Sequence, residues 1–468
     1  MAAGAEARPV WGLPHVAAVA VVVAAAAVSE ADAIVGMPAG TLKALALVLA
    51  AIAAWATGIV PGHVTAIAFF AVAMLAGVAP AAVVFSGFTS TAFWLIFGGL
   101  VLGLAIRNTG FGEVVAHRLA RLFGQSYSGT VAGLLLLGVG LSFVMPSSLG
   151  RAALLIPIAL AVADRLGFSE GTRGRMGIVV ATAFGTHVPS FAILPANVPN
   201  VVLAANAASL FGVQLSFGHY LLLHFPILGA LKALVILGLV LILFPDRAAP
   251  SAEAGPVPPR PLTRDQRRLG MLLLASMVLM CTDDLHHLSP AWISLGAAVL
   301  CLLPPLALVP MAAVDKELNH GALLHVAGLI GLGAVVSASG LGGLVAHRLI
   351  EWLPLAAGEA ARNFTVLSGL SMVVGLLTTL PGTPAVLTPL AGDLAAASGL
   401  PPEAVLMLQV VGFSTVLAPY QSPPLVVSLH LAKQPVAPLL KFWAALLLLT
   451  ALVLLPLDYL WWRLLGAI

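Results

Sequence analysis

A short polar cluster, MPSSLGR at residues 145–151, interrupts a long apolar stretch and carries side chains suited to binding a charged ligand. The hydroxyls of Ser147 and Ser148 can donate hydrogen bonds to an oxyanion or supply oxygen ligands to a hard cation. A charge such as that of Arg151 is costly in apolar surroundings unless it faces water or a partner, and an anion would be a suitable partner. The alternatives are helix capping by the serines and a snorkelling or helix-end position for Arg151.

A second cluster, TTLPGTP at 378–384, interrupts another apolar stretch with the same kinds of side chain. If the chain re-enters a helix after each cluster, the first N–H groups of that helix face the cluster with a partial positive charge and favour an oxyanion. The predicted substrate-binding residues are Ser147, Ser148, Gly150, Arg151, Thr378, Thr379, Gly382, Thr383, Asn200 and Pro423.

Two later apolar stretches are broken by a Pro-x-x-x-Pro pattern, in PANVPN at 195–200 and in PYQSPP at 419–424. Unwound carbonyls and asparagine side chains suit a hard cation, whereas His187 can carry a proton near neutral pH or serve as a structural histidine. The predicted ion-binding residues are Ser147, Gly185, Thr186, His187, Asn197, Ser414 and Thr415, with Tyr420, Gln421 and Ser422 available in the second break.

The composition places these clusters in a membrane protein. Of the 468 residues, 60% are hydrophobic and 8% are charged, and the mean hydropathy is +1.08, well outside the range of water-soluble domains. The formal net charge is only +3 and the basic residues are scattered, so no nucleic-acid partner is expected. Cys281 and Cys301 lack the spacing of a disulfide framework.

The apolar runs predict about 11 transmembrane helices in an all-α polytopic fold. A span needs about 20 apolar residues, and two further stretches, 129–163 and 364–397, are cut by the polar clusters into limbs of roughly 15 residues, too short to cross. Both stretches are therefore predicted to be re-entrant hairpins. The predicted spans cover residues 10–29, 41–59, 64–84, 90–106, 176–212, 219–244, 269–283, 290–309, 322–340, 403–431 and 437–461.

Arginines on both sides of the first hairpin predict the orientation. Arg107, Arg118 and Arg121 precede it, and Arg165, Arg173 and Arg175 follow it, so the positive-inside rule places both flanks in the cytoplasm. The amino terminus is then cytoplasmic and the carboxyl terminus external. The predicted division is an N-terminal span at 1–40, a first repeat at 41–244, a Pro-rich cytoplasmic linker at 245–268 and a second repeat at 269–468.

The pentapeptide VAHRL occurs twice, at 115–119 and 345–349, each time after an apolar span and a Gly-containing turn. The predicted topology places the first copy inside and the second outside, so the halves are predicted to be inverted repeats. Inverted repeats with broken helices near the midplane are typical of secondary transporters.

Several segments resemble the divalent anion:sodium symporters, the carriers of dicarboxylates, citrate and sulfate. These are VFSGFTSTAFWLIFGGLVLGLAI, PSSLGRAALLIPIALAVA, FGTHVPSFAILPANVPN and PYQSPP. The resemblance implies five spans in each inverted repeat, two hairpins, a homodimer and elevator-type alternating access. It also implies Ser-Asn-Thr motifs at the hairpin tips. This chain has Ser147-Ser148-Leu149 and Thr379-Leu380-Pro381 at those positions, so both asparagines are absent.

We therefore expect a secondary active transporter of small anions, either di- or tricarboxylates or an inorganic oxyanion, in a bacterial-type inner membrane. Its coupling ion would be sodium or a proton, and it would need no other cofactor. A cation/proton antiporter is the alternative, but it normally needs a carboxylate at mid-membrane, and Asp164 and Asp393 lie toward limb ends. A membrane-embedded enzyme would need an acid/base or nucleophile constellation that the sequence does not show.

Overall fold

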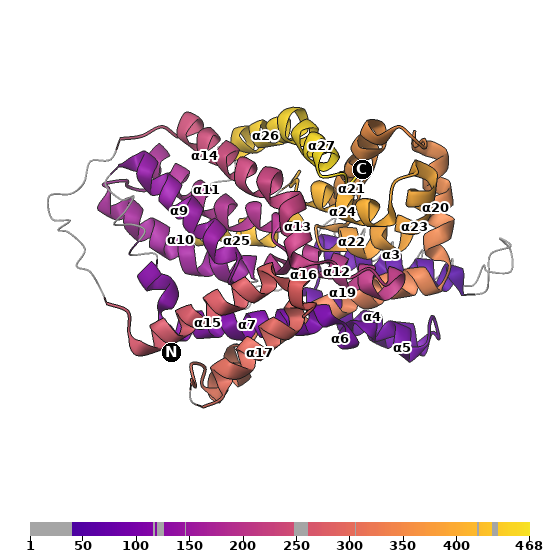
Figure 1. Cartoon of the computed structure of the whole chain (residues 1–468), viewed down its shortest axis with the longest axis horizontal. Coiled ribbons are helices and arrows are strands. Elements are labelled where there is room, and N and C mark those ends of the chain that lie inside the picture. Colours follow the sequence, from indigo (N-terminus) through magenta and orange to yellow (C-terminus); the bar gives the residue numbers. More distant parts are fainter. Residues whose placement is uncertain are drawn as a thin grey trace.

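The computed structural model describes residues 40–115, 118, 126–145, 147–247, 261–304, 306–418, 421–432 and 439–468. Within these segments it consists of helices and contains no strand (Figure 1). The predicted span at 10–29 lies outside the described residues, as do Pro146, Pro419, Tyr420, most of the first VAHRL copy and the middle of the linker.

The helices of the first half follow the predicted order, with boundaries shifted by a few residues. Two 3-10 turns, Pro189–Ala192 and Leu194–Ala196, separate α11 from α12, and a π-helical segment, Phe225–Leu231, joins α13 to α14. The described helices are α3 (Thr41–Thr57), α4 (Gly62–Leu75), α5 (Ala81–Val84), α6 (Ser86–Thr89), α7 (Thr91–Thr109), α9 (Tyr127–Ser142), α10 (Ser148–Arg165), α11 (Arg173–His187), α12 (Val198–Phe211), α13 (Phe217–His224) and α14 (Lys232–Leu243).

The second half has a similar sequence of elements, and its last span also contains a π-helical segment, Thr450–Leu454. The described helices are α15 (Arg264–Cys281), α16 (Asp283–His286), α17 (Pro290–Leu302), α18 (Met311–Glu317), α19 (His320–Ala338), α20 (Leu341–Trp352), α21 (Ala360–Thr378), α22 (Gly382–Leu387), α23 (Ala391–Ser398), α24 (Pro402–Phe413), α25 (Pro423–Leu431), α26 (Leu439–Leu449) and α27 (Leu455–Leu464).

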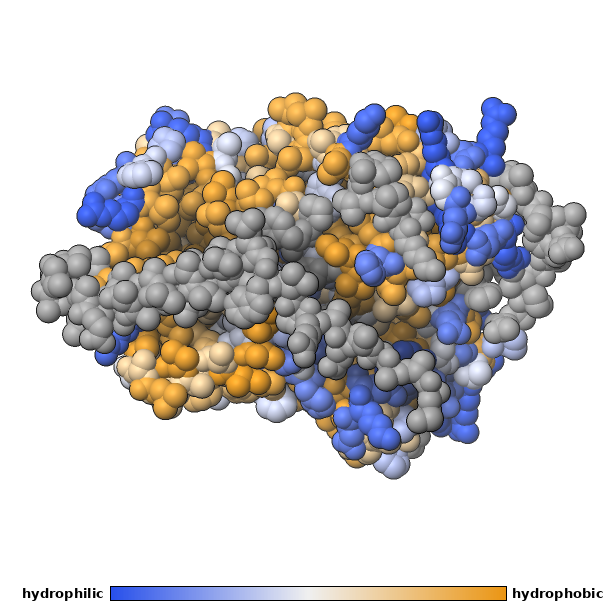
Figure 2. All heavy atoms as spheres, turned by 180° about the vertical axis from the view of Figure 1, so that it is seen from behind, coloured by the Kyte–Doolittle hydropathy of each residue, from blue (hydrophilic) through white to orange (hydrophobic). Residues whose placement is uncertain are grey.

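Five described helices are long and apolar enough to cross a membrane, and a sixth is added if the pair 382–398 and 402–413, bent by 118°, is one span. The predicted total of about 11 spans stays a prediction. The first limb of the second hairpin, α21, has 19 residues rather than the expected 15 or so and meets the length of a full span, so the re-entrant form of this hairpin also stays a prediction. Apolar side chains cover much of the surface seen in Figure 2, as a surface facing lipid requires.

Helix contacts come in matched pairs across the two halves. Helix α7 packs on α17 and α19 packs on α4; α9 packs on α11 and α21 packs on α24; α10 packs on α25 and α12 packs on α22. Each of these three pairings therefore has a counterpart in which every helix is replaced by its equivalent from the other half.

Glycine permits the closest of these approaches. A Cβ on Gly185 of α11 would lie 3.0 Å from Leu135 Cα of α9, and one on Gly412 of α24 would lie 2.1 Å from Ser371 Cβ of α21. The first distance is a tight contact and the second is a steric clash, so these helix pairs leave little or no room for a side chain at the glycine. The structure thus gives Gly185, a predicted ion-binding residue, a packing role.

The buried apolar side chains form two large clusters. The first, which we call the hairpin core, joins α9–α11 and α13–α14 with α21, α23–α24 and α25–α27. The second, which we call the scaffold core, joins α3, α4 and α7 with α15, α17 and α19. Helix α12 contributes to both cores, with Leu203 in the hairpin core and Val202 in the scaffold core. The breaks and the first helix of each hairpin belong to the hairpin core, whereas Met145 at the first tip and Ala385 after the second tip lie in the scaffold core.

Candidate functional site

The first hairpin tip is built around the start of α10. Ser147 is the N-cap residue, and its hydroxyl oxygen accepts a hydrogen bond from the Gly150 N–H at 3.1 Å. The Ser147 hydroxyl proton is not donated to any described residue, and the side chain is half-buried. The structure thus confirms the capping role and leaves one donor of Ser147 available at the tip.

Arg151 joins this tip to the first break. It is 0% exposed, and its five N–H groups all donate to protein acceptors. Nε and Nη2 donate to the Thr186 carbonyl at 3.0 and 2.8 Å, and Nη2 also donates to Ser148 Oγ at 2.9 Å. Nη1 donates to the Met145 carbonyl and, at 3.1 Å, to the Ala196 carbonyl. In this conformation Arg151 offers no free N–H to an anion, and it fixes the backbone around the tip.

The second tip differs in its backbone. Thr379 has φ 113° and ψ 162°, a region that only glycine adopts without strain. The hydroxyls of Thr378 and Thr383 donate to backbone carbonyls, at 2.8 Å to Val374 and at 3.2 Å to Thr379. The half-buried Thr379 hydroxyl makes no hydrogen bond with any described residue, so this tip also presents one available hydroxyl.

Gly382 begins α22 three residues after the strained Thr379. A Cβ at Gly382 would lie 3.0 Å from Thr378 Cβ, which is a tight contact. Pro423 begins α25 after the second break. Neither residue contributes a polar side chain, so any role in anion binding would depend on backbone groups.

The first break is held open by asparagine and serine side chains. Asn200 Nδ2 donates to the carbonyls of Ser190 (3.4 Å), Phe191 (3.1 Å) and Ile193 (2.8 Å). Asn197 caps α12 by accepting from the Asn200 N–H at 3.4 Å, and its Nδ2 donates to Ser190 Oγ at 3.2 Å. These contacts replace the helical hydrogen bonds that the break removes. Asn200 Oδ1 has no partner among the described residues.

The two breaks meet at His187 and Ser422. His187 Nε2 lies 2.6 Å from Ser422 Oγ, and both side chains are buried. His187 Nδ1 has no hydrogen-bond partner within the described part of the chain. This contact joins two segments that the sequence separates by 235 residues.

The second break begins at the end of α24, where the hydroxyls of Ser414 and Thr415 each donate to the Val411 carbonyl at 3.1 Å. The Ser414 carbonyl accepts from Lys232 Nζ at 2.9 Å. Gln421 Oε1 accepts from the N–H groups of Leu417 and Ala418, both at 2.7 Å.

The sequence-predicted residues therefore fall into two groups. Ser147, Ser148, Gly150 and Arg151 are linked by hydrogen bonds to the carbonyl of Thr186 and to the first break, which is linked to the second break through His187. The second tip is connected more loosely. A Cβ on Gly375 would lie 3.1 Å from Thr383 Oγ1 and 3.5 Å from Gln421 Nε2, so Gln421 lies beside this tip.

Sequence reasoning missed two buried polar residues, Asp458 and Asn206. Asp458 is 0% exposed in α27 and is the only acid within the apolar run at 437–461, which was the signal for it. Asn206 in α12 donates to the Pro384 carbonyl at 3.4 Å and so connects α12 to the second hairpin.

The arrangement favours ligand binding over catalysis. Buried polar atoms without partners within the described segments, including His187 Nδ1, Asn200 Oδ1 and Gln421 Nε2, line the breaks and mark where water, an ion or a substrate can bind. No group of three or more His, Cys, Asp or Glu residues that could hold a metal ion occurs among the described residues. The available tip hydroxyls are hydrogen-bond donors, which suits an anion.

Several known proteins are similar to this chain in sequence. A membrane protein of Cupriavidus necator is 24% identical over 421 residues, covering 82% of this chain and 80% of the relative. The putative malate transporter YflS of Bacillus subtilis is 28% identical over 200 residues, 41% of each chain. The inner membrane protein YbhI of Escherichia coli is 25% identical over 279 residues, covering 54% of this chain and 55% of the relative.

The crystal structure of the Alcanivorax borkumensis YdaH transporter superposes with a TM-score of 0.57 and 20% identity, covering 82% of this chain and 87% of that one, which shows a shared fold. The family model described as "sodium:sulfate symporter transmembrane region" matches residues 10–468. The resemblance to the divalent anion:sodium symporters is thereby confirmed. The chain is an integral membrane protein and belongs to the sodium:sulfate symporter family, a family of transporters.

Proposed function

We propose that the chain is an ion-coupled secondary active transporter of small divalent anions, with both hairpin tips contacting the substrate. The observation that carries this proposal is the pair of available hydroxyls. Ser147 and Thr379 are half-buried, occupy the tips of the two hairpins, and donate their hydroxyl protons to no described residue. Two donors from opposite halves suit an anion with a charge at each end, such as a dicarboxylate, or a compact oxyanion such as sulfate.

Dicarboxylates are the first substrates to test. The name of the Bacillus subtilis relative refers to malate, and the family description refers to sulfate. The first tip adds the N-terminus of the 18-residue helix α10, whose first N–H groups favour a negative charge. The absence of both motif asparagines leaves fewer side-chain donors, so we expect selection by size and charge more than by a specific amide contact.

We propose an elevator movement in which the hairpin core moves against the scaffold core. The division of the buried apolar residues into these two clusters supports this proposal. The matched helix contacts of the two halves support the inverted repeat. A cavity lies at the boundary, lined by Phe143, Val144 and Pro195 of the moving part and by Leu273 and Ser294 of the scaffold.

The homodimer, the cytoplasmic amino terminus and the external carboxyl terminus are further proposals from the family resemblance and the arginine distribution. Cross-linking of the purified protein tests the dimer. Accessibility of single cysteines introduced at residues 247 and 468 tests the orientation. We expect residue 247 to react from the cytoplasmic side and residue 468 from the external side.

Transport into proteoliposomes tests the function. Labelled succinate, malate, citrate and sulfate are offered to the full-length protein under an imposed sodium gradient and, separately, an imposed proton gradient. We expect at least one of them to accumulate above protein-free vesicles. If none accumulates or exchanges under either gradient, the anion-transport proposal is wrong.

A further inference from the structure

At each of the two breaks, the helix that leads into the break ends near a backbone carbonyl that accepts hydrogen bonds from a basic side chain. At the end of α11 the Thr186 carbonyl accepts two hydrogen bonds from Arg151, at 3.0 and 2.8 Å. At the end of α24 the Ser414 carbonyl accepts from Lys232 Nζ at 2.9 Å. Carbonyls at the C-terminal ends of broken helices carry partial negative charge and are where transporters commonly bind a coupling cation.

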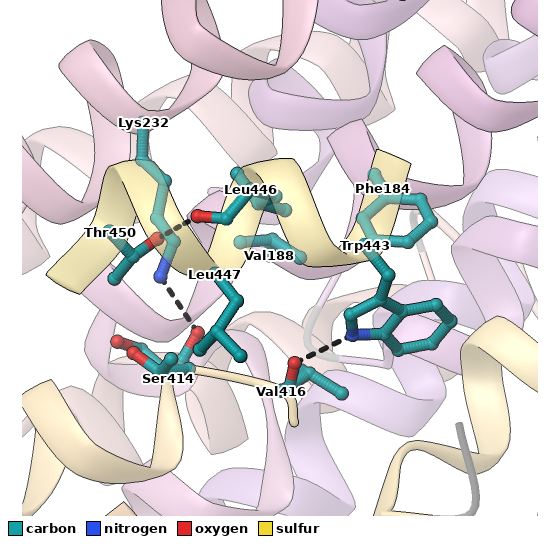
Figure 3. Close-up of a pocket in the computed structure, with 10 residues that line it drawn as sticks. Phe184, Val188, Lys232, Ser414, Val416, Trp443, Leu446, Leu447 and Thr450 are labelled. Atoms are coloured by element: carbon teal, nitrogen blue, oxygen red, sulfur yellow. Dashed lines mark hydrogen bonds between the residues drawn. The ribbon is translucent and has the colours of Figure 1, made fainter. Parts of the chain in front are cut away.

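Lys232 reaches the Ser414 carbonyl from a different helix, and its side chain is buried. It is 1% exposed at the start of α14, and its side chain points toward Ser414 in a small cavity that Phe184, Val188 and Leu446 also line (Figure 3). No other residue lining this cavity is ionisable. A buried ammonium bound to a carbonyl at a helix end occupies the position that a small hard cation would take.

A second carbonyl at the end of α24 also accepts from a protein donor. The Val416 carbonyl accepts from Trp443 Nε1 at 2.6 Å (Figure 3). The hydroxyl protons of Ser414 and Thr415 are both directed at the Val411 carbonyl. A hard cation needs several oxygen ligands at once, and here the Lys232 ammonium holds the Ser414 carbonyl and the Trp443 N–H holds the Val416 carbonyl, so that a second cation at this helix end would also be repelled by the ammonium. A sodium ion, which the family description implies, does not fit this arrangement.

Asp458 is a buried acidic residue that interacts with Lys232. It is fully buried in α27, interacts electrostatically with Lys232, and its two carboxylate oxygens have no hydrogen-bond partner among the described residues. A buried ammonium without an opposite charge is strongly destabilising. Trp462 lies beside Asp458, and its ring is 5.7 Å from that of His224, which in turn is 4.6 Å from the ring of Tyr220. Lys232 and Asp458 thus lie on the last spans of the two halves, where α14 packs on α26.

We infer that Arg151 and Lys232 are tethered cations that take the place of coupling sodium at the ends of α11 and α24, so that this chain binds its anion without sodium. This inference rests on the proposed function for its role in transport, but the sodium-binding part stands on the structure alone. Sodium-independent binding would distinguish this chain from the sodium symport that the family description implies.

Thermal unfolding of the purified full-length protein tests sodium binding without any transport. Unfolding temperatures are compared in sodium chloride and choline chloride at equal ionic strength, because a ligand that binds only the folded protein raises the unfolding temperature. We expect no sodium-specific shift in the wild type. We expect Lys232→Met to unfold at a lower temperature in choline and to recover part of this loss in sodium, because the freed Ser414 carbonyl can then bind an ion.

Lys441 in α26 is exposed and provides the matched control, since Lys441→Met removes the same charge without opening a carbonyl. Lys232→Arg keeps a cation at the carbonyl and should remain insensitive to sodium. A sodium-specific shift in the wild type overturns the inference. Absence of a sodium-specific shift in Lys232→Met overturns the role of Lys232, and if this variant does not fold, the wild type and Lys232→Arg decide the inference.

Anion counterflow in proteoliposomes separates the two proposals. Labelled anion exchanges against unlabelled anion with sodium or choline as the only monovalent cation, and we expect rates that agree within about twofold, less than 0.5 kcal/mol. Counterflow that requires sodium overturns the inference while supporting anion transport. Absence of counterflow with either cation overturns the proposed function, and the thermal comparison still decides whether sodium binds.

Discussion

His187 Nε2 and Ser422 Oγ, 2.6 Å apart and both buried, connect the break after α11 to the break before α25. The two residues come from opposite halves of the chain. Because His187 ends α11 directly before the first break and Ser422 directly precedes α25 at the end of the second, this contact fixes how the two breaks face each other. We therefore expect the pair to matter both for the stability of the hairpin core and for the geometry of the anion site.

Ser422→Ala tests this contact. The variant leaves both ring nitrogens of His187 without a partner among the described residues, and an unsatisfied buried polar group costs about 1–3 kcal/mol. We expect a corresponding loss of unfolding free energy and slower anion counterflow.

Ser428→Ala is the matched control for Ser422→Ala. Ser428 is buried in the same helix, but its hydroxyl donates only to the Pro424 carbonyl one turn earlier, at 2.7 Å. We expect this variant to keep the stability and counterflow rate of the wild type to within about 0.5 kcal/mol. Equal losses in the two variants would show that the His187 contact has no special role.

Arg151→Lys distinguishes support of the tip from direct binding of the anion. Lysine keeps the charge but has three N–H donors instead of five, so the carbonyls of Met145, Thr186 and Ala196 and the Ser148 hydroxyl cannot all be satisfied. We expect a loss of at least about 2 kcal/mol of unfolding free energy. Chemical denaturation in detergent measures it. If Arg151→Lys keeps wild-type stability and loses only anion affinity, Arg151 contacts the substrate directly.

The places where the apolar stretches are interrupted could be predicted because each is marked by local chemistry. Polar and Pro/Gly clusters inside apolar runs end helices wherever they occur, so α10 begins at Ser148 and α12 at Val198, inside the predicted interruptions. The length of α21 was underestimated mainly because the helix begins at Ala360, four residues before the predicted apolar stretch at 364–397, and it also includes Thr378 of the polar cluster.

The partners of the buried charges could not be predicted in the same way. Lys232 and Ser414 are 182 residues apart, and their contact depends on how the last span of the first half packs near the second break. Sequence reasoning found no partner for Lys232 and did not single out Asp458. For Arg151 an anion partner and a snorkelling or helix-end position were both considered, but backbone carbonyls from three segments satisfy it instead.

Ser147→Ala tests the first tip. The variant removes a hydroxyl that can donate to the anion, and the loss of one hydrogen bond to a charged group is worth about 1.5–3 kcal/mol, so we expect anion affinity to fall by roughly 10- to 100-fold. It also removes the N-cap of α10, which costs about 1 kcal/mol of stability.

Ser126→Ala is the control that separates the two effects of Ser147→Ala, the loss of a helix cap and the loss of a hydrogen bond to the anion. Ser126 caps α9, and its hydroxyl accepts from the Gly129 N–H at 3.1 Å, the same distance as at Ser147. We expect a similar loss of stability without a change in anion affinity. Competition by unlabelled anion in a counterflow assay measures the affinity, and equal affinities in the two alanine variants would remove Ser147 from the proposed site.

Thr379→Gly tests whether the second tip stores strain for function. A β-branched residue at φ 113° and ψ 162° costs about 1–3 kcal/mol, and glycine adopts this conformation freely, at an entropic cost of about 0.4–1 kcal/mol in the unfolded chain. We expect the variant to gain about 1 kcal/mol of unfolding free energy and to bind the anion about tenfold more weakly, because the hydroxyl is lost. Thr379→Ser keeps the hydroxyl and most of the strain, so it should keep wild-type affinity. A glycine variant that is more stable and binds the anion as tightly as the wild type would show that the Thr379 hydroxyl does not contact the substrate.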